Sequence, residues 1–144
     1  MYNIIKHLHS INRWVILALL LISVLTAFSK WISKKEYTAQ DKKLALFTLI
    51  SSHIQLILGI ILLLITERLF FTEGWRESPI NKYFVFAHLP AMILGIIFIT
   101  IGYSISKRKT KSKDKFMFTW IFFLIGLLSI LGGIPWGIHG AGWY

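Results

Sequence analysis

Imidazole side chains are the groups in this sequence best suited to chemistry. His53 lies within a long apolar run, His88 lies near the start of another, and His9 comes just before a third. Hydrocarbon offers no water to solvate an imidazole, so a histidine inside it needs a hydrogen-bond partner, a bound ligand or an aqueous cavity. These three histidines are therefore the candidate ligand set, and the apolar runs are the elements that must position them.

Four segments, 11–32, 44–65, 83–105 and 116–136, are long and apolar enough to cross a membrane. Each meets the requirement of about 20 residues for a hydrocarbon core about 30 Å thick. The chain has 144 residues, of which 56% are hydrophobic and only 15% charged. A water-soluble domain of this size could not hide that much apolar surface. The sequence therefore predicts one all-α domain, residues 1–144, forming a four-transmembrane-helix bundle with up-down topology.

The charges of the connecting segments predict the orientation. Segment 30–43 carries five lysines against two acids, and segment 106–115 carries six cations against one acid. Segment 66–82 carries three charges of each sign. Short connections rich in Lys and Arg stay in the cytoplasm. We therefore expect a multi-pass protein of the bacterial inner (cytoplasmic) membrane with both termini on the periplasmic side. Clustering of the cations in these loops disfavours nucleic acid as a partner.

The histidines suggest a haem site. At about 1.5 Å of rise per residue, His88 lies roughly 8 Å below the outer boundary and His53 roughly 18 Å, while His9 is at the boundary. A b-type haem needs one or two axial imidazoles from facing helices, and cations near its propionates. His88 is the best single ligand candidate, with His9 or His53 as its partner. Arg13 is four residues after His9, hence on the same helical face, and could hold a propionate.

Each of these residues also has a purely structural interpretation. His9 and Arg13 can serve as interfacial anchors whose polar ends reach water. His53 can hydrogen-bond a serine or a backbone carbonyl across the bundle. No apolar run contains an acidic residue, which argues against a proton relay or a cation transporter. The sequence supplies no nucleophile and base for a membrane hydrolase. An electron-transfer protein is thus favoured over a stand-alone enzyme.

Several short motifs resemble those of one family. They are Leu8-His-Ser-Ile-Asn-Arg-Trp14, Asp41-Lys-Lys-Leu-Ala-Leu-Phe-Thr48 leading to His53-Ile-Gln-Leu-Ile-Leu-Gly59, Ala87-His-Leu-Pro-Ala-Met92, and Ile134-Pro-Trp136. The sequence resembles, nearly throughout, a group of small four-helix bacterial membrane proteins commonly labelled cytochrome b-like. The resemblance implies a haem b cofactor, with the family's histidines at His9, His53 and His88 and its arginine at Arg13.

Two other functions remain open. One is a non-catalytic accessory subunit that packs, among membrane lipid, against a larger bacterial membrane complex through small-residue positions such as Gly126, Gly132 and Gly133. The other is a zinc or copper site near the outer surface, built from His9, His88 and His139. For the haem-binding protein, the expected partner is a quinone or another redox protein.

Overall fold

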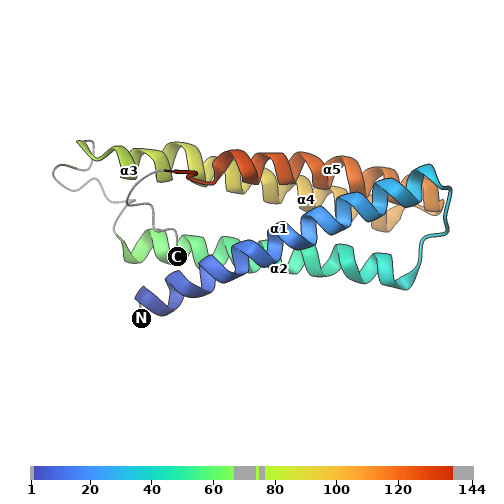
Figure 1. Cartoon of the computed structure of the whole chain (residues 1–144), viewed down its shortest axis with the longest axis horizontal. Coiled ribbons are helices and arrows are strands. Elements are labelled where there is room, and N and C mark those ends of the chain that lie inside the picture. The colour runs from blue at the N-terminus through green and yellow to red at the C-terminus, as the bar shows by residue number, and fades with distance from the viewer. Residues whose placement is uncertain (1, 67–73, 75–76, 138–144) are drawn as a thin grey trace.

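The computed structural model describes residues 2–66, 74 and 77–137, and within them every regular element is a helix. The elements are α1 (Tyr2–Ile32), α2 (Ala39–Ile65), α3 (Pro79–Tyr83), η2 (Phe84–His88), α4 (Leu89–Arg108) and α5 (Ser112–Gly133). The segments α3, η2 and α4 follow one another directly and form one candidate span. The four resulting spans pack as an up-down bundle (Figure 1), and each is long and apolar enough to cross a membrane. The predicted multi-pass four-helix bundle is confirmed.

At five ends the helices extend beyond the predicted apolar runs, whereas α5 ends at Gly133 instead of residue 136. α1 begins at Tyr2 instead of residue 11, so His9 lies inside a helix and not before one. Residues 2–10 contain neither Pro nor Gly, and nothing in them ends the helix. α2 begins at Ala39, α4 continues to Arg108 and α5 begins at Ser112. The added turns are polar, and hydrophobicity alone does not detect them.

Both lysine-rich connections lie at the same end of the bundle. Figure 1 shows the α1–α2 and α4–α5 connections together, and the start of α1, the start of α3 and the end of α5 at the opposite end. We call the first the loop end and the second the open end. This arrangement follows from antiparallel helices joined by short connections.

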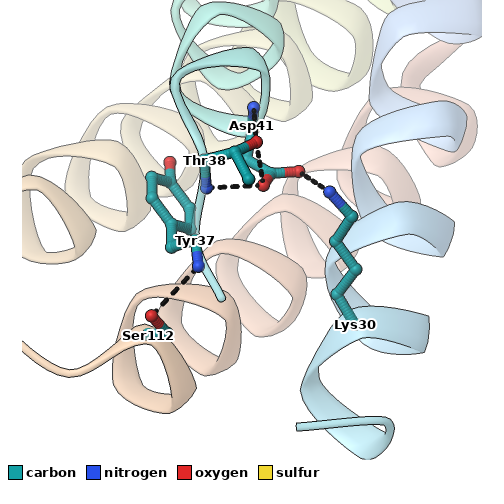
Figure 2. Close-up of polar contacts among 5 residues, drawn as sticks. All are labelled: Lys30, Tyr37, Thr38, Asp41 and Ser112. Atoms are coloured by element: carbon teal, nitrogen blue, oxygen red, sulfur yellow. Dashed lines mark hydrogen bonds and ion pairs between the residues drawn. The ribbon is translucent and has the colours of Figure 1, made fainter. Parts of the chain in front are cut away.

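A network of hydrogen bonds holds the loop end together (Figure 2). Thr38 caps α2: its side chain accepts from the backbone N–H of Asp41, and the Asp41 carboxylate accepts from the Thr38 N–H. The same carboxylate forms an ion pair with Lys30 of α1, with 2.7 Å between Nζ and Oδ1. The Tyr37 N–H donates to the Ser112 hydroxyl at 3.0 Å. The α1–α2 connection is thereby fastened to the start of α5.

The core lies mainly between α1, α4 and α5. Its buried members are Ile16, Leu20, Val24, Ala45, Ile99, Phe123, Leu127, Ile130 and Ile134. Glycines bring α4 and α5 close together: a Cβ at Gly95 would lie 3.1 Å from the Gly126 carbonyl oxygen, and a Cβ at Gly126 would lie 3.0 Å from that of Gly95. Only small residues allow this approach of two backbones. α2 packs mainly on α1 and less on α4, which leaves room for a cavity near the open end.

Candidate functional site

A cavity of about 220 Å³ lies between α1, α2 and the η2–α4 segment, towards the open end of the bundle. Apolar side chains make up most of its wall. Its polar lining includes Lys6, His9 and Arg13 from α1, Gln55 from α2, and His88 from η2. The cavity therefore joins three of the four residues that the sequence singled out.

His9 and His88 both line this cavity and lie close together. Their ring centroids are 6.5 Å apart and the ring planes are inclined by 56°. His88 is the last residue of the π-helical turn η2, in which the Leu89 N–H bonds to the Phe84 carbonyl. Pro90, two residues after His88, has no N–H to donate. π-helical turns are rare and often occur at functional sites.

The orientation of the His88 ring is set by α5. Its Nδ1 lies 2.8 Å from the carbonyl oxygen of Gly133, and the Tyr83 hydroxyl donates to the same oxygen at 3.0 Å. A carbonyl can only accept, so Nδ1 carries the proton and the lone pair of the neutral ring is on Nε2. Histidines that bind metals commonly donate their other N–H to a backbone carbonyl or a carboxylate. His88 thus has the tautomer of a metal ligand.

The His9 ring is held against α2. Its Nδ1 is buried and has no hydrogen-bond partner among the residues that the structure describes. A Cβ at Gly59 would lie 3.3 Å from His9 Cε1, so the glycine leaves the ring its space. A buried polar atom without a partner is costly, and a bound ligand or water at His9 would remove that cost.

Polar side chains join α1 to α2 beside the cavity. The Gln55 amide donates to the His9 carbonyl at 2.9 Å. The Asn12 amide donates to Gln55 Oε1 at 2.9 Å and to the Ser51 carbonyl at 3.0 Å. These contacts set the height of His9 relative to α2.

Two cations of α1 also line the cavity. Arg13 donates to the Ser10 hydroxyl at 3.4 Å, and its guanidinium lies 5.3 Å from the centre of the Trp14 ring. Lys6, three residues before His9 and seven before Arg13, lies on the same helical face. The sequence reasoning missed Lys6 because it began the helix at residue 11. In a helix that begins at Tyr2, the spacing of Lys6, His9 and Arg13 predicts that all three lie on one face.

His53 lies apart from this group. It is exposed on the outer surface of α2 and does not line the cavity. Its Nδ1 lies 2.9 Å from the Leu49 carbonyl, one turn earlier in the same helix. The structure thus brings His9, Arg13 and His88 together and leaves His53 outside.

The three-histidine metal site stays a prediction. His139 lies outside the described residues, so its distance from His9 and His88 is not defined. Within residues 2–66, 74 and 77–137, no three His, Cys, Asp or Glu side chains lie close enough to hold one metal ion.

Comparison of the chain with known protein families, with characterised proteins and with solved structures gives no match. What is established is a small membrane protein of four long apolar helices, and no family is identified for it.

Proposed function

We propose that this chain is a membrane-embedded b-type haem protein that transfers electrons in the bacterial cytoplasmic membrane. His9 and His88 would hold the haem iron, and Arg13 and Lys6 would pair with its propionates. Both termini face the periplasm in this proposal, so the haem lies near the outer surface. Its partners are a quinol in the membrane and an outward-facing redox protein.

The distance between the two imidazoles carries the proposal. Two metal–nitrogen bonds of about 2.0 Å, with roughly 1.1 Å from each nitrogen to its ring centre, would place the ring centres of two imidazoles that share one metal ion about 6.2 Å apart. The His9 and His88 centroids are 6.5 Å apart. Aromatic rings that only pack together lie about 4.5–7 Å apart. The separation favours a shared ligand here because the two rings also line one apolar cavity together with two cations.

The polar side chains and the apolar wall of the cavity suit a haem, but the cavity must widen to hold one. Two imidazoles, two cations and an apolar wall are what a haem requires. At about 220 Å³, however, the cavity is smaller than the roughly 300–1,000 Å³ typical of ligand pockets. A macrocycle therefore requires Leu56, Ile60 or Met92 to change rotamer, or α2 to move away from α4.

The protein's own residues set the properties of the site. The Gly133 carbonyl accepts a hydrogen bond from the Nδ1–H of His88. This bond increases the basicity of His88 Nε2. Lys6 and Arg13 offset the charge of two carboxylates near the membrane boundary. The apolar wall limits the entry of water, and this exclusion of water would influence the redox potential of a bound haem. When bound, haem supplies one-electron transfer.

The visible spectrum of the purified protein tests the proposal. After expression with added haem precursor, we expect a Soret band that shifts on reduction with dithionite. His9→Ala and His88→Ala should each abolish the low-spin spectrum, whereas His53→Ala should keep it, since His53 lies outside the cavity. Helix content from circular dichroism shows that each variant folds. A colourless wild-type protein, or equal loss in His53→Ala, contradicts the proposal.

One observation favours a second role, as a subunit of a larger membrane complex. His53 is exposed on a face of α2 that also exposes Phe47, Ile50, Ile54 and Ile57. An imidazole facing hydrocarbon is costly, so a polar group of a neighbouring transmembrane helix would stabilise it. Native mass spectrometry from membranes extracted in mild detergent tests this role. His53→Leu should release the partner subunit, and a wild-type protein that is always monomeric excludes the role.

A further inference from the structure

Three lysines from different helices meet at a small pocket at the loop end. Lys42 of α2, Lys107 of α4 and Lys115 of α5 line a cavity of about 80 Å³, together with Tyr37, Tyr103 and Ser106. We call it the basic pocket. It lies at the end opposite the histidine cavity, where the α1–α2 and α4–α5 connections lie in Figure 1.

The positive charge of the basic pocket is not neutralised by the described part of the protein. None of its three lysines forms an ion pair there, and the nearby Asp41 is bound to Lys30. Glu36 accepts a hydrogen bond from the Ser112 hydroxyl at 2.8 Å. Lys42 and Lys107 are exposed and Lys115 is half-buried, so water screens the repulsion among their ammonium groups and leaves them accessible to an anion.

The walls of the pocket are held by contacts that do not depend on a ligand. The Ser106 hydroxyl of α4 donates to the Lys115 carbonyl of α5 at 3.0 Å. The Tyr37 N–H donates to Ser112, as Figure 2 shows, and the Lys115 ammonium lies 5.0 Å from the centre of the Tyr37 ring. An anion would therefore find a site that is already formed.

The remaining groups suit a phosphate. The Tyr37 phenol is protonated at neutral pH and can donate a hydrogen bond, and burial raises its pKa further. A cavity needs about 10–15 Å³ for each water that it holds. The space of about 80 Å³ thus accepts the five heavy atoms of a phosphate group, but not an acyl chain.

We propose that the basic pocket binds a phosphate group, carried by the headgroup of an anionic phospholipid or present as free inorganic phosphate. Basic pockets between transmembrane helices are typical sites for anionic lipid headgroups. The pocket lies where the apolar parts of the spans end, and the Trp31 and Trp120 rings, 5.6 Å apart, mark the same end of the bundle. Both observations place it at the depth of lipid headgroups.

Native mass spectrometry of the full chain in neutral detergent tests the site, with phosphatidylglycerol and phosphatidylcholine as probes. We expect one phosphatidylglycerol to bind selectively. Each lysine near a membrane surface contributes a factor of about five, so Lys42→Gln with Lys107→Gln should weaken binding about 25-fold. The control, Lys111→Gln with Lys113→Gln, removes the same charge from exposed positions outside the pocket.

A parallel titration with inorganic phosphate, followed by thermal unfolding at constant ionic strength, distinguishes the two sources. Stabilisation by phosphate without selective lipid binding assigns the site to the free ion, and the reverse assigns it to the lipid. Lys42→Arg with Lys107→Arg keeps both positive charges and should retain binding. That result would show that the glutamine variants lose binding through lost charge and not through misfolding. Equal losses in the two glutamine double variants, or no response to either probe, overturn the proposal.

Discussion

Gly133 connects helix packing to the candidate site, and its replacement by alanine tests that connection. A Cβ at Gly133 would lie 2.6 Å from Ala91 Cβ and 2.7 Å from Met92 Cε. The methionine end can move, but the alanine Cβ is fixed to the α4 backbone, so α4 and α5 must separate. The Gly133 carbonyl, which accepts from His88 and Tyr83, moves with them.

The expected cost follows from two opposing effects. Overpacking a tight contact costs about 1–3 kcal/mol. Replacing glycine by alanine in a helix stabilises the folded state by about 0.5–1 kcal/mol. A net loss of about 1–2 kcal/mol in the free energy of unfolding is therefore expected for Gly133→Ala.

The adjacent Gly132 provides a matched control. A Cβ there would meet nothing within 4 Å, so Gly132→Ala should stabilise the protein by about 0.5–1 kcal/mol. Unfolding of both variants in mixed micelles with increasing dodecyl sulfate measures the difference. If the two variants shift the midpoint in the same direction, the α4–α5 contact is not as tight as the structure indicates.

Three further predictions concern the loop end and the core, each measured by the same unfolding titration. Lys34 has φ +52°, which glycine adopts more easily, so Lys34→Gly should stabilise the protein by about 0.5–1 kcal/mol, and a loss would contradict the assigned backbone. Asp41→Ala removes the partner of both Thr38 and Lys30 and should cost about 1–2 kcal/mol, whereas an unchanged midpoint would show that the cap is dispensable. Ser23→Ala removes a 2.9 Å hydrogen bond to the Thr48 hydroxyl and should cost only about 0.6 kcal/mol, the average for hydrogen bonds between membrane helices. A larger loss would show that this bond also fixes the position of α1 relative to α2.

The spans and their number could be predicted from the sequence because they depend on length and hydrophobicity alone. The helix ends could not. The turns at Tyr2, Ala39 and Arg108 continue the helices past the apolar runs, and hydropathy does not detect them. Because the apolar run begins at residue 11, the predicted helix excluded both Lys6 and His9.

The sequence by itself determined that four segments are long and apolar enough to cross a membrane and that the lysines gather in two of the connections, because these properties depend only on composition along the chain. Only the tertiary structure decided which side of each helix faces inward. Core and lipid surroundings are both apolar, so a membrane helix shows no clear polar face from which its rotation could be inferred. The contacts of Gly95 with Gly126, and of Gln55 with His9, set that rotation. They bring His9 and His88 close together and leave His53 exposed.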